Sequence, residues 1–109
     1  MSAASQLSAG EALALHALIT PTTHGIASRI LGKAAGGNIT LFAFDEGQGL
    51  TEHTSPFDAF VLVLEGALRL TIGGATVHAT PGTIVRMPAE IPHALDASEP
   101  CRMMLIMLK

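Results

Sequence analysis

The sequence predicts an all-β fold, a sandwich or barrel of short strands preceded by one short helix. Beyond Pro21, short apolar runs alternate with turn-forming residues at regular intervals, which is the pattern of a β-sandwich or barrel. No helical segment separates these runs, and this indicates an all-β domain. The 109 residues, 49% hydrophobic and 14% charged, suffice for one globular domain with its own core. We therefore divide the chain into an N-terminal arm, residues 1–24, and a β domain, residues 25–109.

The N-terminal arm is predicted to carry a short helix over residues 9–19. Residues 8–11, Ser-Ala-Gly-Glu, have the form of a capping box, in which the first and last side chains satisfy backbone amides. Apolar residues follow them at helical spacing. Pro21 is expected to end the helix because proline has no amide hydrogen to donate.

The first half of the β domain is predicted to hold three strands. Segment 25–31 is the first, and the glycines of 34–38 provide a turn that leads into a second strand at 39–44. Residues 45–49, Asp-Glu-Gly-Gln-Gly, are expected to form a loop. Segment 58–64, DAFVLVL, is strongly β-forming and is predicted to be the third strand.

Five further strands are predicted at 67–72, 75–79, 83–87, 93–97 and 101–108. A Gly-Gly pair separates the first two and predicts a tight hairpin. A Pro-Gly turn precedes the third, and a proline follows its last residue.

The strand at 58–64 is apolar on both faces. Alternation along a strand separates two sets of side chains, Ala59, Val61 and Val63 on one face and Phe60, Leu62 and Leu64 on the other. One face can line the domain core, and the other then needs a second sheet or a second subunit. Together with the low charge content, this predicts a homodimer.

The charge pattern excludes several functional classes. The net charge is −3 and the six Lys and Arg are scattered, so no basic stripe for nucleic acid exists.

No apolar run is long enough for a membrane span, and no Lys or Arg precedes Arg29 to start a signal peptide. Cys101 is the only cysteine, so no intrachain disulfide forms. These features predict a cytoplasmic protein.

Two segments, 47–66 and 82–97, resemble the signature motifs of the cupin superfamily. The first family motif, G-x5-H-x-H-x3-E-x6-G, matches this chain at Gly47, His53 and Gly66. Ser55 stands at the second histidine position and Ala59 at the glutamate. The second motif, G-x5-P-x-G-x2-H-x3-N, matches at three positions, Gly82, Pro88 and His93.

The resemblance is to small, single-domain, RmlC-like cupins of the cupin-2 type. It implies a double-stranded β-helix, or jelly-roll barrel, for residues 25–109, with a pocket at its open end. Cupins that bind metal hold Fe, Mn, Ni or Zn with three histidines and one glutamate, and positions left open accept substrate. The jelly-roll expectation concerns fold only, since cupins host many chemistries.

The metal site that the resemblance implies is reduced to two of four ligands, His53 and His93. Ser55 is a candidate auxiliary ligand through its hydroxyl. Asp58 is another, although it precedes the glutamate position by one residue and faces inward only if the chain is bulged there. A divalent transition metal and a metal-free pocket both remain open.

The pocket itself is predicted to be apolar. Met103, Leu105 and Met107 share one face of the last strand, and methionine suits an adaptable apolar pocket. Met87, Val61 and Val63 are assigned to the same wall, with ordinary core packing as the alternative. His78 is predicted to face solvent.

Three functions are compatible with these residues. The first is a protein that binds a small molecule, as a sensor or accessory subunit, with little or no catalysis. The second is a metal-dependent cupin enzyme of dioxygenase or isomerase type. The third is a structural role for the dimer. A fourth function, sugar epimerisation as some cupins perform it, is excluded, because that reaction uses a tyrosine acid and this chain has no tyrosine.

Overall fold

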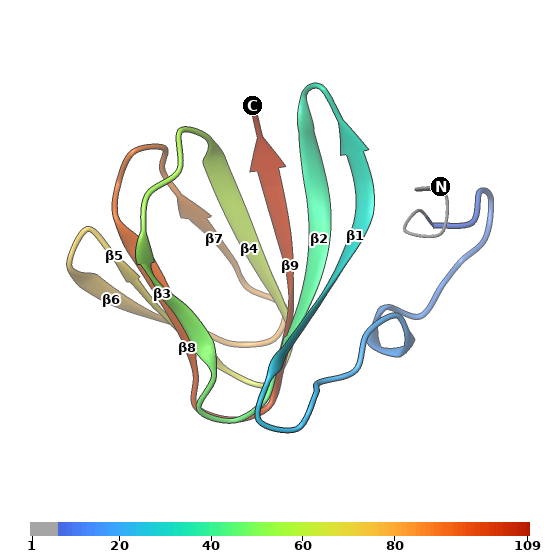
Figure 1. The fold of residues 1–109 in the computed structure, drawn as a ribbon, viewed down its shortest axis with the longest axis horizontal. Coiled ribbons are helices and arrows are strands. Elements are labelled where there is room, and N and C mark those ends of the chain that lie inside the picture. Colours follow the sequence, from blue (N-terminus) through green and yellow to red (C-terminus); the bar gives the residue numbers. More distant parts are fainter. Residues whose placement is uncertain (1–6) are drawn as a thin grey trace.

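Two antiparallel β-sheets face each other in the computed structural model, which describes residues 7–109 (Figure 1). The strands are β1 (Ile26–Ala34), β2 (Gly37–Phe44), β3 (Gly49–His53), β4 (Asp58–Glu65), β5 (Leu68–Ile72), β6 (Ala75–Ala79), β7 (Ile84–Met87), β8 (His93–Ala97) and β9 (Cys101–Leu108). One sheet has the order β1-β2-β9-β4-β7 and the other has the order β3-β8-β5-β6. The predicted all-β fold is therefore confirmed, as a two-layered β-sandwich.

The main core lies between the two sheets. Val61 and Val63 of β4 are fully buried there, against Leu70 of β5 and Leu95 of β8. Residues on the other face of β4, such as Leu62, remain partly exposed. The predicted alternation along this strand is confirmed, and it aims one apolar face at the second sheet.

The hairpin between β5 and β6 turns at Gly73 and Gly74. Their φ angles are +57° and +86°, and Ile72 pairs with Ala75 across the turn. Two successive positive φ angles define a turn whose twist matches that of the flanking strands, and glycine adopts them without steric cost. The Gly-Gly pair therefore sets the register of this hairpin, as predicted.

The predicted helix at 9–19 is wrong. Within the described part of the arm only Leu15–Ala17 is helical, as a single 3-10 turn, and no side chain caps it. Gly10 has a φ of +73°, which is incompatible with a right-handed helix at that point. A helix of about eleven residues is marginal by itself in water, so contacts with the sheet decide the conformation of the arm.

Those contacts come from two arginines on the outer face of the larger sheet. Arg29 Nη1 donates to the Leu18 carbonyl at 3.0 Å and Arg102 Nε donates to the Ile19 carbonyl at 2.8 Å. The Ile19 side chain is buried against Leu41 in a second, smaller core. The arm is thereby held as an irregular segment beside the larger sheet.

Strand β3 was not predicted from the sequence. Most of its side chains are exposed, so the segment lacks the apolar alternation that identifies a strand. Its pairing with β8 depends on a close backbone approach at Gly49, where a Cβ atom would overlap the Leu95 carbonyl oxygen. Among the residues described, no helix is long and apolar enough to cross a membrane.

Candidate ligand site between the sheets

Two histidines meet where β3 pairs with β8. His53 lies directly opposite His93 in the register, and residues so placed project from the same face of a sheet. The two Nε2 atoms are 3.1 Å apart, with ring centroids separated by 4.4 Å and ring planes at 71°. The His93 side chain is buried, whereas His53 is exposed. The pair therefore connects the interior to the surface.

Hydrogen bonds to backbone carbonyls determine the tautomers of both rings. His53 Nδ1 lies 2.7 Å from the Thr51 carbonyl oxygen, and His93 Nδ1 lies 3.1 Å from that of Ile91. A carbonyl oxygen only accepts, so both Nδ1 atoms must carry the proton and donate it. In the neutral rings both Nε2 atoms then present lone pairs to each other. Such a pair is satisfied when a shared proton, a cation or a donor group of a ligand lies between them.

A cavity of about 110 Å³ adjoins the histidine pair. It is lined by Leu50, His53, Ser55, Ala59, Met87, His93, Leu95, Met103, Leu105 and Met107. Apart from the two imidazoles and Ser55, all of these side chains are apolar. The arrangement is a small apolar cavity with a few polar groups at one side, as is common in ligand sites.

The structure brings most of the predicted pocket residues to this cavity. Met87, Met103, Leu105 and Met107 all line it, as does Ser55. Val61 and Val63 do not line it; they lie further along β4 than the lining residue Ala59 and pack in the core between the sheets. Their assignment to the pocket wall is therefore wrong.

Two lining leucines were missed from the sequence. Leu95 follows His93 by two residues on the same strand, so the period of two could have identified it. Leu50 lies on the unpredicted strand β3, and no sequence signal points to it.

Asp58 does not line the cavity, contrary to its assignment as an auxiliary ligand. Its Oδ1 accepts a hydrogen bond from the Ala89 amide at 2.8 Å, and its Oδ2 pairs with Arg86 Nη1 at 3.2 Å. Strand β4 begins at Asp58 and Ala59 lines the cavity, so regular alternation turns Asp58 to the opposite face. No bulge reverses that orientation. Ser55 Oγ accepts a hydrogen bond from the Phe57 amide at 3.2 Å.

The spacing of the two imidazoles fits a pair of ligands on one metal ion. With metal–nitrogen bonds of about 2.0–2.1 Å, two nitrogens at bond angles of about 90–110° lie about 2.8–3.4 Å apart. The observed Nε2 separation of 3.1 Å falls within that range. The remaining donors of the usual set are absent, and no cluster of three or more His, Cys, Asp or Glu that could hold a metal occurs in residues 7–109. The site therefore supplies two ligands at a suitable spacing for a divalent ion but lacks the other donors that such an ion needs.

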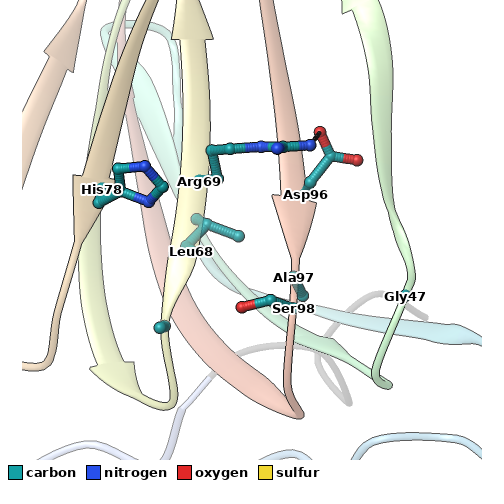
Figure 2. A pocket seen from close by; sticks show the side chains of 8 residues that line it. Gly47, Leu68, Arg69, His78, Asp96, Ala97 and Ser98 are labelled. Carbon is teal, nitrogen blue, oxygen red and sulfur yellow. Dashed lines mark hydrogen bonds and ion pairs between the residues drawn. The ribbon is translucent and has the colours of Figure 1, made fainter.

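A second hollow, of about 300 Å³, lies on the outer face of the smaller sheet (Figure 2). Arg69 of β5 lies between His78 of β6 and Asp96 of β8 there. The Arg69 guanidinium points to Asp96, with Nη2 3.2 Å from Oδ2, and both side chains are more than half exposed. His78 is exposed, as predicted. Because water screens the ion pair of Arg69 and Asp96, we place the candidate site at the cavity beside His53 and His93, called the histidine cavity below.

Comparison with known proteins gives one consistent relationship. Residues 40–107 match the family model described as "Cupin domain". A conserved protein of unknown function from Streptococcus pyogenes is 35% identical with a TM-score of 0.89, covering 94% of this chain and 90% of its own. A cupin superfamily protein from Desulfitobacterium hafniense is 25% identical with a TM-score of 0.88, covering 94% of each chain. No curated protein matches the sequence.

A further similar structure is longer. It is a Cupin 2 conserved barrel domain protein from Leptotrichia buccalis, 30% identical with a TM-score of 0.83. The similarity covers 87% of this chain and 46% of that one.

Proposed function

Because the chain belongs to the cupin superfamily, we propose that it binds a small molecule in the histidine cavity, on a metal site reduced to two of the family's four usual ligands. One observation carries this proposal. The Nε2 atoms of His53 and His93 lie 3.1 Å apart at the side of an otherwise apolar cavity. Two polar groups in such a wall orient a ligand whose remaining surface is apolar.

The dimensions of the cavity limit the ligand. Its volume of about 110 Å³ lies well below the range of about 300–1,000 Å³ typical of sites for drug-sized molecules. Because His53 is exposed, a larger molecule would have to leave part of itself outside. The convergent lone pairs favour a ligand that offers a hydrogen-bond donor, such as a hydroxyl group.

A screen of small molecules against the metal-free protein tests this function. We expect small alcohols and phenols to bind and to shift the NMR resonances of cavity residues such as Met103. His53→Ala should weaken this binding, whereas His78→Ala, which alters an exposed histidine of another strand, should leave it unchanged. Equal binding by both variants would refute a role for the histidine pair.

A second candidate function is a metal-dependent enzyme of dioxygenase or isomerase type. The Nε2 spacing supports it, because it suits two ligands of one Fe, Mn, Ni or Zn ion. His53 and His93 would hold the ion, which would polarise a bound oxygen-containing substrate. The Ser55 hydroxyl lies on the same cavity and would orient that substrate.

Elemental analysis of tag-free protein purified without chelators separates the two candidates. Near-stoichiometric metal that disappears in His53→Ala and His93→Ala would support the enzyme. Metal content that neither variant changes would eliminate it, while the small-molecule function would stand.

The proposal includes a homodimer formed through the outer face of the larger sheet. Paired residues place an apolar surface there, in two adjacent rows, Ile39, Ile106 and Phe60, then Leu62 and Ile84. Ile84 is 59% exposed. With only 14% charged residues in the chain, a second copy of the same apolar face is the complementary partner.

A further inference from the structure

We propose that the histidine cavity selects a soft monovalent cation, copper(I), through the thioether sulfurs of Met87 and Met107. This inference rests on the cavity of the proposed function and concerns which metal that cavity accepts. It departs from the divalent ions that a histidine and glutamate set would hold. No electron transfer is involved, since the ion binds as copper(I) and remains so.

The sheet register puts two methionines beside the position where a carboxylate is missing. Ala59 pairs with Met87 on β7 and with Met107 on β9, so the three residues form one row across the larger sheet. All three line the cavity together with His53 and His93. Because alanine ends at Cβ, the space next to it is open to the flexible side chains on either side. Thioethers therefore occupy the row where a carboxylate would be needed for a hard ion.

A third sulfur lies nearby. Met103 is fully buried and lines the same cavity from β9. In contrast, Met104 projects from the opposite face of that strand and packs against the smaller core under the arm. Of the four methionines in residues 7–109, three therefore line the cavity and one lies outside it, which supplies an internal control.

The donor set at the cavity is soft. Thioether sulfur and neutral imidazole suit copper(I), whereas carboxylate and water oxygens suit harder ions such as manganese(II). In the tautomers of His53 and His93 both Nε2 atoms carry lone pairs, and these two atoms lie 3.1 Å apart. Two nitrogens and one or two thioethers make a three- or four-coordinate site.

Charge further favours a monovalent ion. No carboxylate lines the cavity, and Asp58, the carboxylate expected there from the sequence, is bound to Arg86 and to the Ala89 amide. The cost of desolvating an ion grows with the square of its charge, so a divalent ion loses far more solvation than a monovalent one. A site built only from neutral donors offers no anion to offset that loss.

Titration of the full-length protein with copper(I), under anaerobic conditions and against a chelator of known affinity, tests the inference. We expect one equivalent to bind, at least about a hundredfold more tightly than zinc(II) or manganese(II). Met87→Leu and Met107→Leu keep side-chain volume and remove sulfur. Each should weaken copper(I) binding by about tenfold or more, and Met104→Leu should not change it.

Silver(I), a redox-inert substitute, provides a second readout by NMR of protein labelled at the methionine methyl groups. The resonances of Met87 and Met107 should shift on binding, while that of Met104 should not. Histidine shifts without methionine shifts, or tighter binding of zinc(II) than of copper(I), would overturn the inference.

The small-molecule screen on metal-free protein distinguishes this inference from the function it rests on. Small-molecule binding by the metal-free, unmodified protein, together with a preference for copper(I) that falls in Met87→Leu, supports both. Small-molecule binding with no preference for copper(I) overturns the inference alone. If Met87→Leu unfolds, the silver(I) spectrum of the unmodified protein decides the question.

Discussion

His53 and His93 are 40 residues apart in the chain, yet their Nε2 atoms lie within 3.1 Å of each other. The relationship depends on one register, the pairing of β3 with β8, which sets the two residues directly opposite. The two Nδ1 hydrogen bonds to backbone carbonyls then fix how each ring is turned. Imidazole positions held by backbone contacts are prepared for a ligand before it arrives.

Removing the buried histidine should destabilise the protein more than removing the exposed one. His93→Ala removes a buried ring and leaves a cavity and an unpaired Ile91 carbonyl, so we expect a loss of about 2 kcal/mol. His53→Ala should cost less, because water replaces its contacts. Urea unfolding monitored by circular dichroism measures both. Equal losses would contradict the burial difference.

The approach of β3 to β8 should require glycine at position 49. Gly49→Ala places a methyl group on the Leu95 carbonyl, and we expect a loss of about 2 kcal/mol or more. Gly32→Ala is the control, since a Cβ there meets nothing within 4 Å. Thermal unfolding compares the two variants. An unchanged midpoint for Gly49→Ala would mean that the pairing around His53 adapts easily.

The Cys101 thiol should be unreactive while the protein is folded. Burial, followed by the nearby Glu99 and Glu65 carboxylates, raises the pKa of Cys101 from 9.0 to about 11. Two pKa units reduce the reactive thiolate about a hundredfold near pH 8. Iodoacetamide should therefore label Cys101 slowly in buffer and rapidly in concentrated urea. Rapid labelling of the folded protein would contradict its burial.

The same shift predicts how stability depends on pH at the alkaline end. Below pH 9 both the folded and the unfolded chain keep the thiol proton, so Cys101 contributes no pH dependence there. As pH rises above about 9 the unfolded chain releases this proton first, and the free energy of unfolding falls. A Cys101→Ala variant should lose this part of the pH dependence when unfolding is measured between pH 8 and pH 11.

The arm should be released when its arginine contact is removed. Arg102→Leu loses the hydrogen bond to the Ile19 carbonyl and the ion pair with Glu65, and we expect a loss of about 1–2 kcal/mol. Amide exchange over residues 15–20 should accelerate at the same time. Arg69→Leu, which breaks an exposed pair, should cost less than about 1 kcal/mol. Unchanged exchange in Arg102→Leu would contradict the role of this contact.

Dimerisation should depend on the outer face of the larger sheet. Ile84→Glu adds a charge to an exposed residue of that face, so we expect a fold-preserving change that weakens self-association at least about tenfold. Thr76→Glu, an exposed position on the other sheet, is the control. Sedimentation at micromolar concentration measures both. A monomeric unmodified protein would refute the dimer.

Most strands were predictable because their signals are local. Alternation of apolar residues along β4 and the Gly73-Gly74 turn identify elements without any knowledge of their neighbours. Strand β3 was not predicted because an exposed edge strand needs no apolar alternation. What makes it a strand is its pairing with the β8 backbone, which its own sequence does not reveal. The conformation of the arm was mispredicted for a related reason, since it follows from hydrogen bonds with Arg29 and Arg102 rather than from helical propensity.

The sequence by itself determined the all-β fold, the family resemblance, and the choice of His53 and His93 as the histidines that match the family motifs. Only the tertiary structure decided that Asp58 faces away, that Val61 and Val63 belong to the core, and that Met87 and Met107 flank Ala59. The reason is that local patterns specify which residues can form a strand. Which side chains meet across strands depends on register, and register is set by the packing of the two sheets together.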